Sequence, residues 1–238
     1  MKSLSLKSLP FNNSLCAKAL GLSLLFTTSA SYGQPEPVLQ ESNTQQQNQN
    51  QEKVKTKLMD KLQTLKFFRA DFKQIIQDSS GEVLQQGEGT LAISKPNLVN
   101  WHTTDPDETL IVSNGKNLWF YDPFIEQVTL YSVEKSTMNT PILLLSSVDK
   151  KLWDNYQVTS TNDENYVIHA LDENSQVKSL RLTFTANTVK PALVGFSILD
   201  ATGQLSVITL SKVDYDNRPE PALFEFIVPE GVSINDQQ

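Results

Sequence analysis

Apolar and polar residues alternate along most of the chain after residue 66, which is the pattern of strands that bury one face. The segment FFRADFKQIIQ places Phe68, Ala70 and Phe72 on one face, and LVNWHT does the same for Val99 and Trp101. Further segments follow at hairpin spacing: VLQQGEGTLAIS, TLIVS, KNLWFY, EQVTLYSV, NYQVTST, NYVIHAL, VKSLRLTF, ALVGFSIL, QLSVITLSKV and ALFEFIV. An antiparallel sheet of about eleven such strands curls, so we expect one mainly β domain shaped as a barrel-like cup.

Two segments have helical patterns instead. EKVKTKLMDKLQTLK repeats apolar residues at helical spacing, with Leu58 and Leu62 on one stripe. In residues 136–147, STMNTPILLLSS, a proline suited to the first helical turn comes directly before Ile142 to Leu145. We predict that both helices lie across the mouth of the cup.

One hairpin raises a question about the second face of the sheet. Asn114-Gly115 is a strong turn signal between TLIVS and KNLWFY. The second of these strands carries Trp119, Phe120 and Tyr121 in succession, so bulky groups occupy both of its faces. If Phe120 faces inward, Trp119 and Tyr121 face outward. There they either form a docking patch or pack against another part of the chain, and the pattern leaves both options open.

The N-terminal part of the chain differs in composition from the rest. In residues 1–33, lysines precede an apolar run from Ala19 to Phe26, and small residues follow it, which is the pattern of a cleaved secretory signal. A short anchor helix is the alternative. Residues 34–51, QPEPVLQESNTQQQNQNQ, have few apolar side chains to bury, so we expect a flexible leader. The folded domain then spans residues 52–238.

Composition excludes several kinds of partner and site. The only cysteine, Cys16, lies inside the signal segment and precedes the apolar run, whereas a lipid-attachment cysteine follows it. The mature chain therefore has no disulfide framework and no cysteine metal site. The formal net charge is −7 for the whole chain, and loss of the three signal lysines makes it −10. Such a chain is a poor partner for nucleic acid or anionic membranes, and we expect no stable membrane insertion.

The sequence offers little catalytic chemistry. Its two histidines, His102 and His169, both lie in predicted strands and are interpreted as ordinary sheet residues. It lacks the motifs of serine hydrolases, zinc proteases and phosphate-binding loops. The acidic stretch TTDPDET, with Asp105, Asp107 and Glu108, lacks the spacing of a calcium loop and is interpreted as a turn. We expect no enzyme activity, cofactor or metal. A secreted hydrolase is the alternative, which turnover of ester substrates would reveal.

Apolar side chains gather on the predicted concave side of the sheet and on the two helices. A cup with this lining suits an acyl chain, although a plain hydrophobic core has the same pattern. The candidate lipid-binding residues are Leu58, Leu62, Phe68, Phe72, Leu91, Ile93, Val99, Trp101, Ile142 and Leu145.

The central part of the chain resembles a known family. Residues 87–129, GEGTLAISKPNLVNWHTTDPDETLIVSNGKNLWFYDPFIEQVT, resemble the outer-membrane lipoprotein carrier protein (LolA) family. The family pattern there is roughly G-x-G-x-L-x-x-x-[RK]-P-x-x-x-x-W, followed by a hairpin with L-W-x-Y-x-P. Phe68 and Phe72, the Asn-Thr-Pro before the second helix and the ending VPEGVSIND also resemble this family. The resemblance extends over most of residues 52–235.

The resemblance implies both a fold and a function. The fold is an unclosed antiparallel β-barrel covered by a helical lid. The function is that of a monomeric chaperone in the periplasm of Gram-negative bacteria. It would receive acylated lipoproteins from an inner-membrane ABC transporter (LolCDE) and deliver them to an outer-membrane lipoprotein acceptor (LolB).

One position departs from the family pattern. The family commonly has arginine before the proline of the turn that leads into the third strand, where it hydrogen-bonds to lid backbone and keeps the lid shut. This chain has Lys95 there. Lysine donates hydrogen bonds but lacks the planar fork of arginine. The sequence therefore predicts either a weaker latch at Lys95 or a latch elsewhere.

Other functions remain open at this point. The outer-membrane acceptor would need a lipid-attachment cysteine directly after the signal, where this chain has Ser31 to Gln34. A periplasmic half-barrel regulator that senses lipid would need a second domain, for which about 205 mature residues leave little room. A general carrier of apolar ligands would have the same lining as a lipoprotein carrier.

Overall fold

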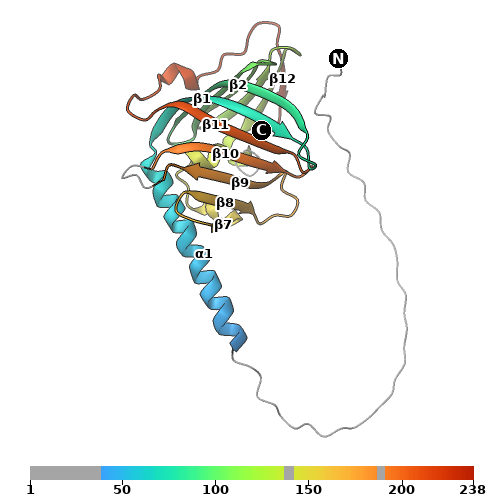
Figure 1. Ribbon diagram of the computed structural model, residues 1–238. Helices are drawn as coiled ribbons and strands as arrows, with labels where there is room; N and C mark the ends of the chain where they lie inside the picture. The colour runs from blue at the N-terminus through green and yellow to red at the C-terminus, as the bar shows by residue number, and fades with distance from the viewer. Residues whose placement is uncertain (1–38, 137–141, 187–190) are drawn as a thin grey trace, which may run out of the picture. The chain divides into compact units, whose positions relative to one another are not determined.

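The computed structural model describes residues 39–136, 142–186 and 191–238, with side-chain surroundings from residue 49 onward. In these ranges one sheet has twelve strands, in the order β12-β6-β5-β4-β3-β2-β1-β11-β10-β9-β8-β7 (Figure 1). The strands are β1 (Phe67–Gln77), β2 (Val83–Ser94), β3 (Leu98–Asp105), β4 (Thr109–Asn114), β5 (Asn117–Asp122), β6 (Gln127–Ser132), β7 (Tyr156–Ser160), β8 (Asn165–Ala170), β9 (Val177–Phe184), β10 (Leu193–Asp200), β11 (Leu205–Asp214) and β12 (Ser233–Asp236).

The sheet is antiparallel except at one edge, where β12 runs parallel to β6. Strand β1 joins the two halves, because it pairs with β2 on one side and with β11 on the other. Within the described ranges the end strands β12 and β7 do not pair with each other, so the sheet is unclosed. The predicted fold class, mainly β with an unclosed antiparallel sheet and short helices, is confirmed.

Burial along β1 follows the predicted period of two. Phe68 and Phe72 are both 1% exposed and Ala70 is 4% exposed, whereas Arg69 and Lys73, on the opposite face, are exposed. This face of the sheet, which also carries Trp101, is called the inner face below. The opposite face is called the outer face.

The pairing of strand β2 with β3 is irregular at a glycine. The register between β2 and β3 shifts between Glu88 and Gly89. A Cβ atom at Gly89 would lie 1.9 Å from the carbonyl oxygen of His102 and 2.9 Å from the ring of Phe72. Only glycine permits this close approach of the two strands, and the space left by its missing side chain lies against the ring of Phe72.

The helices differ in part from their predicted extents. Helix α1 spans Leu39–Thr64 and therefore begins inside the segment 34–51 that the sequence predicts to be flexible. That prediction is wrong for residues 39–51, because glutamine is a good helix former and a helix does not need apolar burial along its whole length. Two short helices, α2 (Val133–Ser136) and α3 (Ile142–Ser146), lie at or beside the predicted second helix. The proline predicted to begin this helix, and the signal segment 1–33, lie outside the described residues.

The last predicted strand is also wrong. ALFEFIV lies in the 3-10 helix η2 (Pro221–Phe224) and in a segment after it that is not a strand. A further 3-10 helix, η1 (Lys151–Asn155), precedes β7. Three prolines, Pro219, Pro221 and Pro229, surround this segment. Proline cannot donate a ladder hydrogen bond, so the segment is unsuited to a strand inside the sheet.

This C-terminal segment packs on the outer face of the sheet. The Nδ2 atom of Asn100 in β3 donates a hydrogen bond to the carbonyl oxygen of Leu223 at 2.7 Å. The ring centroid of Phe226 lies 6.0 Å from that of Trp119 and 5.6 Å from that of Tyr121. The outward aromatic pair of β5 therefore packs against the chain's own C-terminal segment. Ala92, Val112, Val128 and Phe224 form a second buried layer there, separate from the main core.

Candidate functional site

All candidate lipid-binding side chains lie in one buried cluster. Each of them is at most 8% exposed. The sheet contributes residues from β1, β2 and β3, and the helices contribute residues from α1 and α3. The cluster contains Leu58, Leu62, Phe68, Phe72, Leu91, Ile93, Val99, Trp101, Ile142 and Leu145. The structure thus places the predicted residues together on the inner face of the sheet and under the helices.

An aromatic group stands at the centre of this cluster. The ring centroid of Trp101 lies 4.9 Å from that of Phe72 and 5.8 Å from that of Phe196. The indole Nε1 of Trp101 donates a hydrogen bond to Thr103 Oγ1 at 3.2 Å, so its polar atom is satisfied. Phe196 belongs to β10. Its contact with Trp101 joins the candidate residues of β1 to β3 to the buried residues of the later strands.

The strands β7 to β11 supply interior residues that the sequence analysis did not select. They are Tyr156, Val158, Tyr166, Ile168, Leu180, Leu182, Phe184, Leu193, Phe196, Ile208 and Leu210. Their alternation was visible in segments such as SLRLTF. The pattern could not show that these strands share one interior with β1 to β3, because that depends on the pairing of β1 with β11.

Two helices fill the interior from above the inner face. Helix α1 buries Leu58, Leu62 and Leu65, which are 0%, 3% and 7% exposed. All residues of helix α3 are buried, and among them Leu143 and Leu144 were not among the predicted candidates. Because α1 and α3 cover the same cluster, they are called the lid helices below.

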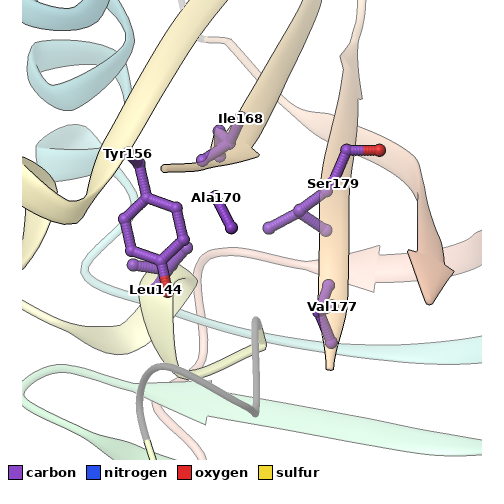
Figure 2. Close-up of a pocket in the computed structure, with 7 residues that line it drawn as sticks. Leu144, Tyr156, Ile168, Ala170, Val177 and Ser179 are labelled. Atoms are coloured by element: carbon purple, nitrogen blue, oxygen red, sulfur yellow. The ribbon is translucent and has the colours of Figure 1, made fainter. Parts of the chain in front are cut away.

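The cavity beneath helix α3 is small. A cavity of about 10 Å³, enough for about one water molecule, lies between α3 and strands β7, β8 and β9. Figure 2 shows Leu144 and Tyr156 on one side of it, with Ile168 and Ala170 beside them and Val177 and Ser179 opposite. Sites for small ligands usually enclose about 300–1,000 Å³. The cavity under α3 is therefore far smaller than a ligand site of this kind.

The turn between β2 and β3 contacts the ends of both lid helices. The Nζ atom of Lys95 donates a hydrogen bond to the carbonyl oxygen of Leu62, in the last turn of α1, at 2.7 Å. The backbone N–H of Lys95 donates to the carbonyl oxygen of Lys66 at 2.9 Å, and that of Asn97 donates to the carbonyl oxygen of Ser146, at the end of α3, at 2.9 Å. One turn of the sheet thus hydrogen-bonds to backbone carbonyl groups at or just past the ends of both lid helices.

The side chain of Lys95 is a charged group in a partly apolar setting. Burial lowers the pKa of its ammonium group from 10.5 to about 8. The bond to Leu62 reaches a carbonyl dipole, which stabilises the ammonium less than a carboxylate would. The position that the sequence predicted as a latch therefore does contact the backbone of α1.

Comparison with known proteins identifies the family. The family model "Outer membrane lipoprotein carrier protein LolA" matches residues 63–227. The chain is 39% identical to an outer-membrane lipoprotein carrier protein of Pseudoalteromonas translucida over 76% of this chain and 86% of that one. It is 37% identical to the protein of the same name from Aliivibrio salmonicida over 93% of this chain and 100% of that one.

The chain belongs to the LolA family. A solved structure of a LolA superfamily protein from Nitrosomonas europaea aligns with a TM-score of 0.43 at 12% identity, covering 73% of this chain and 97% of that chain. That structural similarity is too low to carry an argument. The match to the LolA family model includes strands β1 to β11 and only the last residues of α1.

Other side chains considered in the sequence lie away from the interior of this LolA family member. His102 Nε2 lies 2.8 Å from Glu108 Oε1, and His169 Nε2 lies 3.4 Å from Thr159 Oγ1, both at exposed positions. Across the described ranges, no group of three or more His, Cys, Asp or Glu side chains is placed to hold a metal ion. Among the helices described, none has the length and hydropathy to cross a membrane.

Proposed function

We propose that this protein is a periplasmic carrier that binds the acyl chains of lipoproteins on the inner face of its sheet, under the lid helices. Membership of the LolA family supports a carrier role for lipoproteins. The observation that carries the finer proposal is the single cluster in which sheet and lid bury the predicted lipid-binding side chains. No catalytic step is part of the proposal.

The physical need for such a carrier follows from the hydrophobic effect. Each methylene group removed from water contributes about 0.8 kcal/mol, so a lipoprotein with exposed acyl chains would partition into any membrane it meets. A soluble carrier has to cover these chains while they cross an aqueous compartment. An apolar interior behind movable helices meets this requirement.

The filled interior supports a competitive mechanism. Leu58, Leu62 and Leu144 occupy the space against the inner face, and the cavity beside them has only about 10 Å³. Acyl chains therefore bind only when the lid helices move away. Closure of the lid and binding of cargo then compete for the same apolar surface, which lowers the affinity for cargo and favours its onward transfer.

In this proposal Lys95 acts as a latch for the closed lid. Its hydrogen bond to Leu62 joins the β2–β3 turn to the last turn of α1. Lysine makes one such contact where an arginine fork offers several, so the closed state is held less firmly than with arginine. Substitution of Lys95 by leucine removes the contact and favours the open lid.

The partners in this proposal follow from the family. Acylated lipoproteins are the cargo, an inner-membrane lipoprotein-releasing ABC transporter supplies them, and an outer-membrane lipoprotein acceptor receives them. The carrier works as a monomer, so that one interior holds the acyl chains of one cargo molecule.

Binding of a fluorescent triacylated peptide to the purified chain tests the proposal. We expect a soluble one-to-one complex, and a loss of affinity of about tenfold or more in Trp101→Ala and Ile142→Glu. Ile234→Glu is the matched control for Ile142→Glu, because Ile234 is 56% exposed on β12. Circular dichroism and urea unfolding check that each variant is folded.

The carrier proposal fails if the folded wild-type chain does not bind the peptide. Equal binding by wild type and both interior variants would place the binding surface outside the cluster.

A further inference from the structure

Helix α1 has a second attachment, beside the end strand β7 of the sheet. The Nζ atom of Lys57 lies 2.5 Å from Asp163 Oδ1, in the turn between β7 and β8. One helical turn further on, Lys61 Nζ donates a hydrogen bond to the backbone carbonyl oxygen of Asp163. Two lysines of α1 thus converge on a single residue that is 106 positions from Lys57 in the sequence. This group of three residues is called the Asp163 clasp below.

The clasp lies above the end of the buried cluster. The ammonium group of Lys61 is 5.3 Å from the ring centroid of Tyr166 and 4.8 Å from that of Phe184. These rings are 1% and 2% exposed, so Lys61 covers the interior at this corner. A cation over aromatic faces is attracted by the ring quadrupoles, which adds to the contact with Asp163.

One feature opposes closure at this corner. In the described part of the chain, the buried hydroxyl group of Tyr166 has no hydrogen-bond partner. A buried polar group without a partner destabilises the arrangement that buries it, relative to one that water can reach. Opening of α1 at the clasp would hydrate this hydroxyl group, which favours the open arrangement at this corner.

The contact between α1 and strand β7 is incomplete beside the clasp. An open groove of about 350 Å³ lies between the helix and the strand, lined by Gln51, Glu52, Lys55, Asp154, Tyr156, Gln157, Val158 and Leu171. Strand β7 is also an end strand of the unclosed sheet. Separation of α1 from β7 therefore breaks no strand pairing. If the contacts of the clasp break, the groove extends along α1 to the interior at Tyr166.

We propose that Asp163 is a positioning residue that holds α1 against the end strand β7, and that acyl chains enter between α1 and β7 when the Asp163 clasp breaks. This inference rests on the carrier function proposed above for the entry of acyl chains, but the position of α1 is independent of it. Asp163 and Lys57 have side chains 78% and 53% exposed. Their attraction is therefore screened by salt, unlike the half-buried contact of Lys95 with Leu62.

The position of α1 is measured first, in the absence of cargo. Spin labels at Lys53→Cys on α1 and Ser211→Cys on β11, in a Cys16→Ser background, report the distance between helix and sheet. We expect Asp163→Asn to shift the distribution toward longer distances at about 0.01 M salt, and about 1 M salt to have the same effect on the wild type. Asp163→Asn itself becomes insensitive to salt. The charge exchange Lys57→Asp with Asp163→Lys restores the wild-type distribution.

Entry of cargo is measured next, with the fluorescent triacylated peptide in stopped flow. We expect Asp163→Asn to raise the association rate about two- to fivefold, in line with the strength of an exposed ion pair. Asp60→Asn is the matched control, because it removes an exposed carboxylate of α1 that lies in no ion pair of the described chain. Urea unfolding verifies that both variants are folded.

The outcomes separate this inference from the carrier function. Unchanged distances in Asp163→Asn, or equal changes in Asp60→Asn, would refute the clasp even if the peptide binds. A changed distance without any peptide binding would leave the clasp in place and refute the carrier. A changed distance with an unchanged association rate would place the entry of cargo elsewhere.

Discussion

At the scale of single residues, Lys95 is the position where burial and charge oppose each other most directly. Its side chain is half-buried, and its ammonium group donates a hydrogen bond to the carbonyl oxygen of Leu62 at 2.7 Å. Burial accordingly lowers the pKa of Lys95 to about 8. The identity of this residue was readable from the sequence, but the acceptor in α1 and the extent of burial were not, because both depend on how α1 docks on the β2–β3 turn.

The lowered pKa of Lys95 predicts a pH dependence of stability. Between pH 8 and pH 10.5 the unfolded chain still binds the proton that folded Lys95 has released. The contribution of Lys95 to the free energy of unfolding therefore rises with pH across this window and is constant below it. Urea unfolding at several pH values should show this rise in the wild type relative to Lys95→Met.

Lys116→Met is the control for this measurement, because Lys116 is an exposed lysine at the same end of the sheet. If the wild type and Lys95→Met keep a constant difference in unfolding free energy from pH 7 to pH 10, Lys95 does not titrate in this window.

At the scale of elements, helix α3 depends on its surroundings. It has 5 residues, and all of them are buried. A helix this short is unstable in water by itself, so its stability comes from packing against the sheet. Its apolar run was readable from the sequence. The sequence did not show whether this helix covers a plain core or competes with cargo, because an aliphatic side chain packs equally well against a leucine or an acyl chain.

Leu144→Ala tests the competition between α3 and cargo. Leu144 is 1% exposed and borders the small interior cavity. We expect a loss of about 2–5 kcal/mol in the free energy of unfolding, as for other buried leucines. The closed lid loses this packing while the cargo-bound state loses less, so the affinity for the triacylated peptide should rise.

Val148→Ala is the matched control, because Val148 lies just past α3 and is 59% exposed. A fall in the affinity of Leu144→Ala, with the variant still folded, would argue that Leu144 lines the bound state and does not compete with it.

At the scale of the whole molecule, the strands β2 to β5 carry buried side chains on both faces of the sheet. The inner face of β2 to β5 carries the main cluster, and the outer face carries the second layer under the C-terminal segment. In β5, Trp119 and Tyr121 contact Phe226 on the outer face, whereas Phe120 between them is 36% exposed. The two layers predict that outer-face changes affect stability without affecting the binding of cargo.

Phe224→Ala separates the two layers. Phe224 is 3% exposed on the outer face. We expect a destabilisation of about 3–5 kcal/mol and increased binding of a hydrophobic dye, while the folded fraction keeps its affinity for the triacylated peptide. Ile227→Ala, at a position 87% exposed, should change stability by no more than about 0.5 kcal/mol. A loss of peptide affinity in folded Phe224→Ala would contradict the separation of the layers.

The sequence by itself determined the local elements and which side chains share a face. The period of two placed Phe68 and Phe72 on one face of their strand, and Asn114-Gly115 marked a hairpin, because strand pleating and turn geometry depend on neighbouring residues only. The same patterns predicted a sheet that curls, and the motifs of residues 87–129 pointed to the family that the comparisons then identified.

Only the tertiary structure decided what covers each apolar face. The contact of Lys57 with Asp163, the position of Phe226 on Trp119 and the shared interior of β1 and β10 all join residues far apart in the chain. An apolar stripe in the sequence predicts that its side chains are buried. It does not predict which element covers them, because the hydrophobic effect has no direction and little chemical specificity. The partner is selected when the strands pair and the helices dock, and in this protein that step decides where the lid is held.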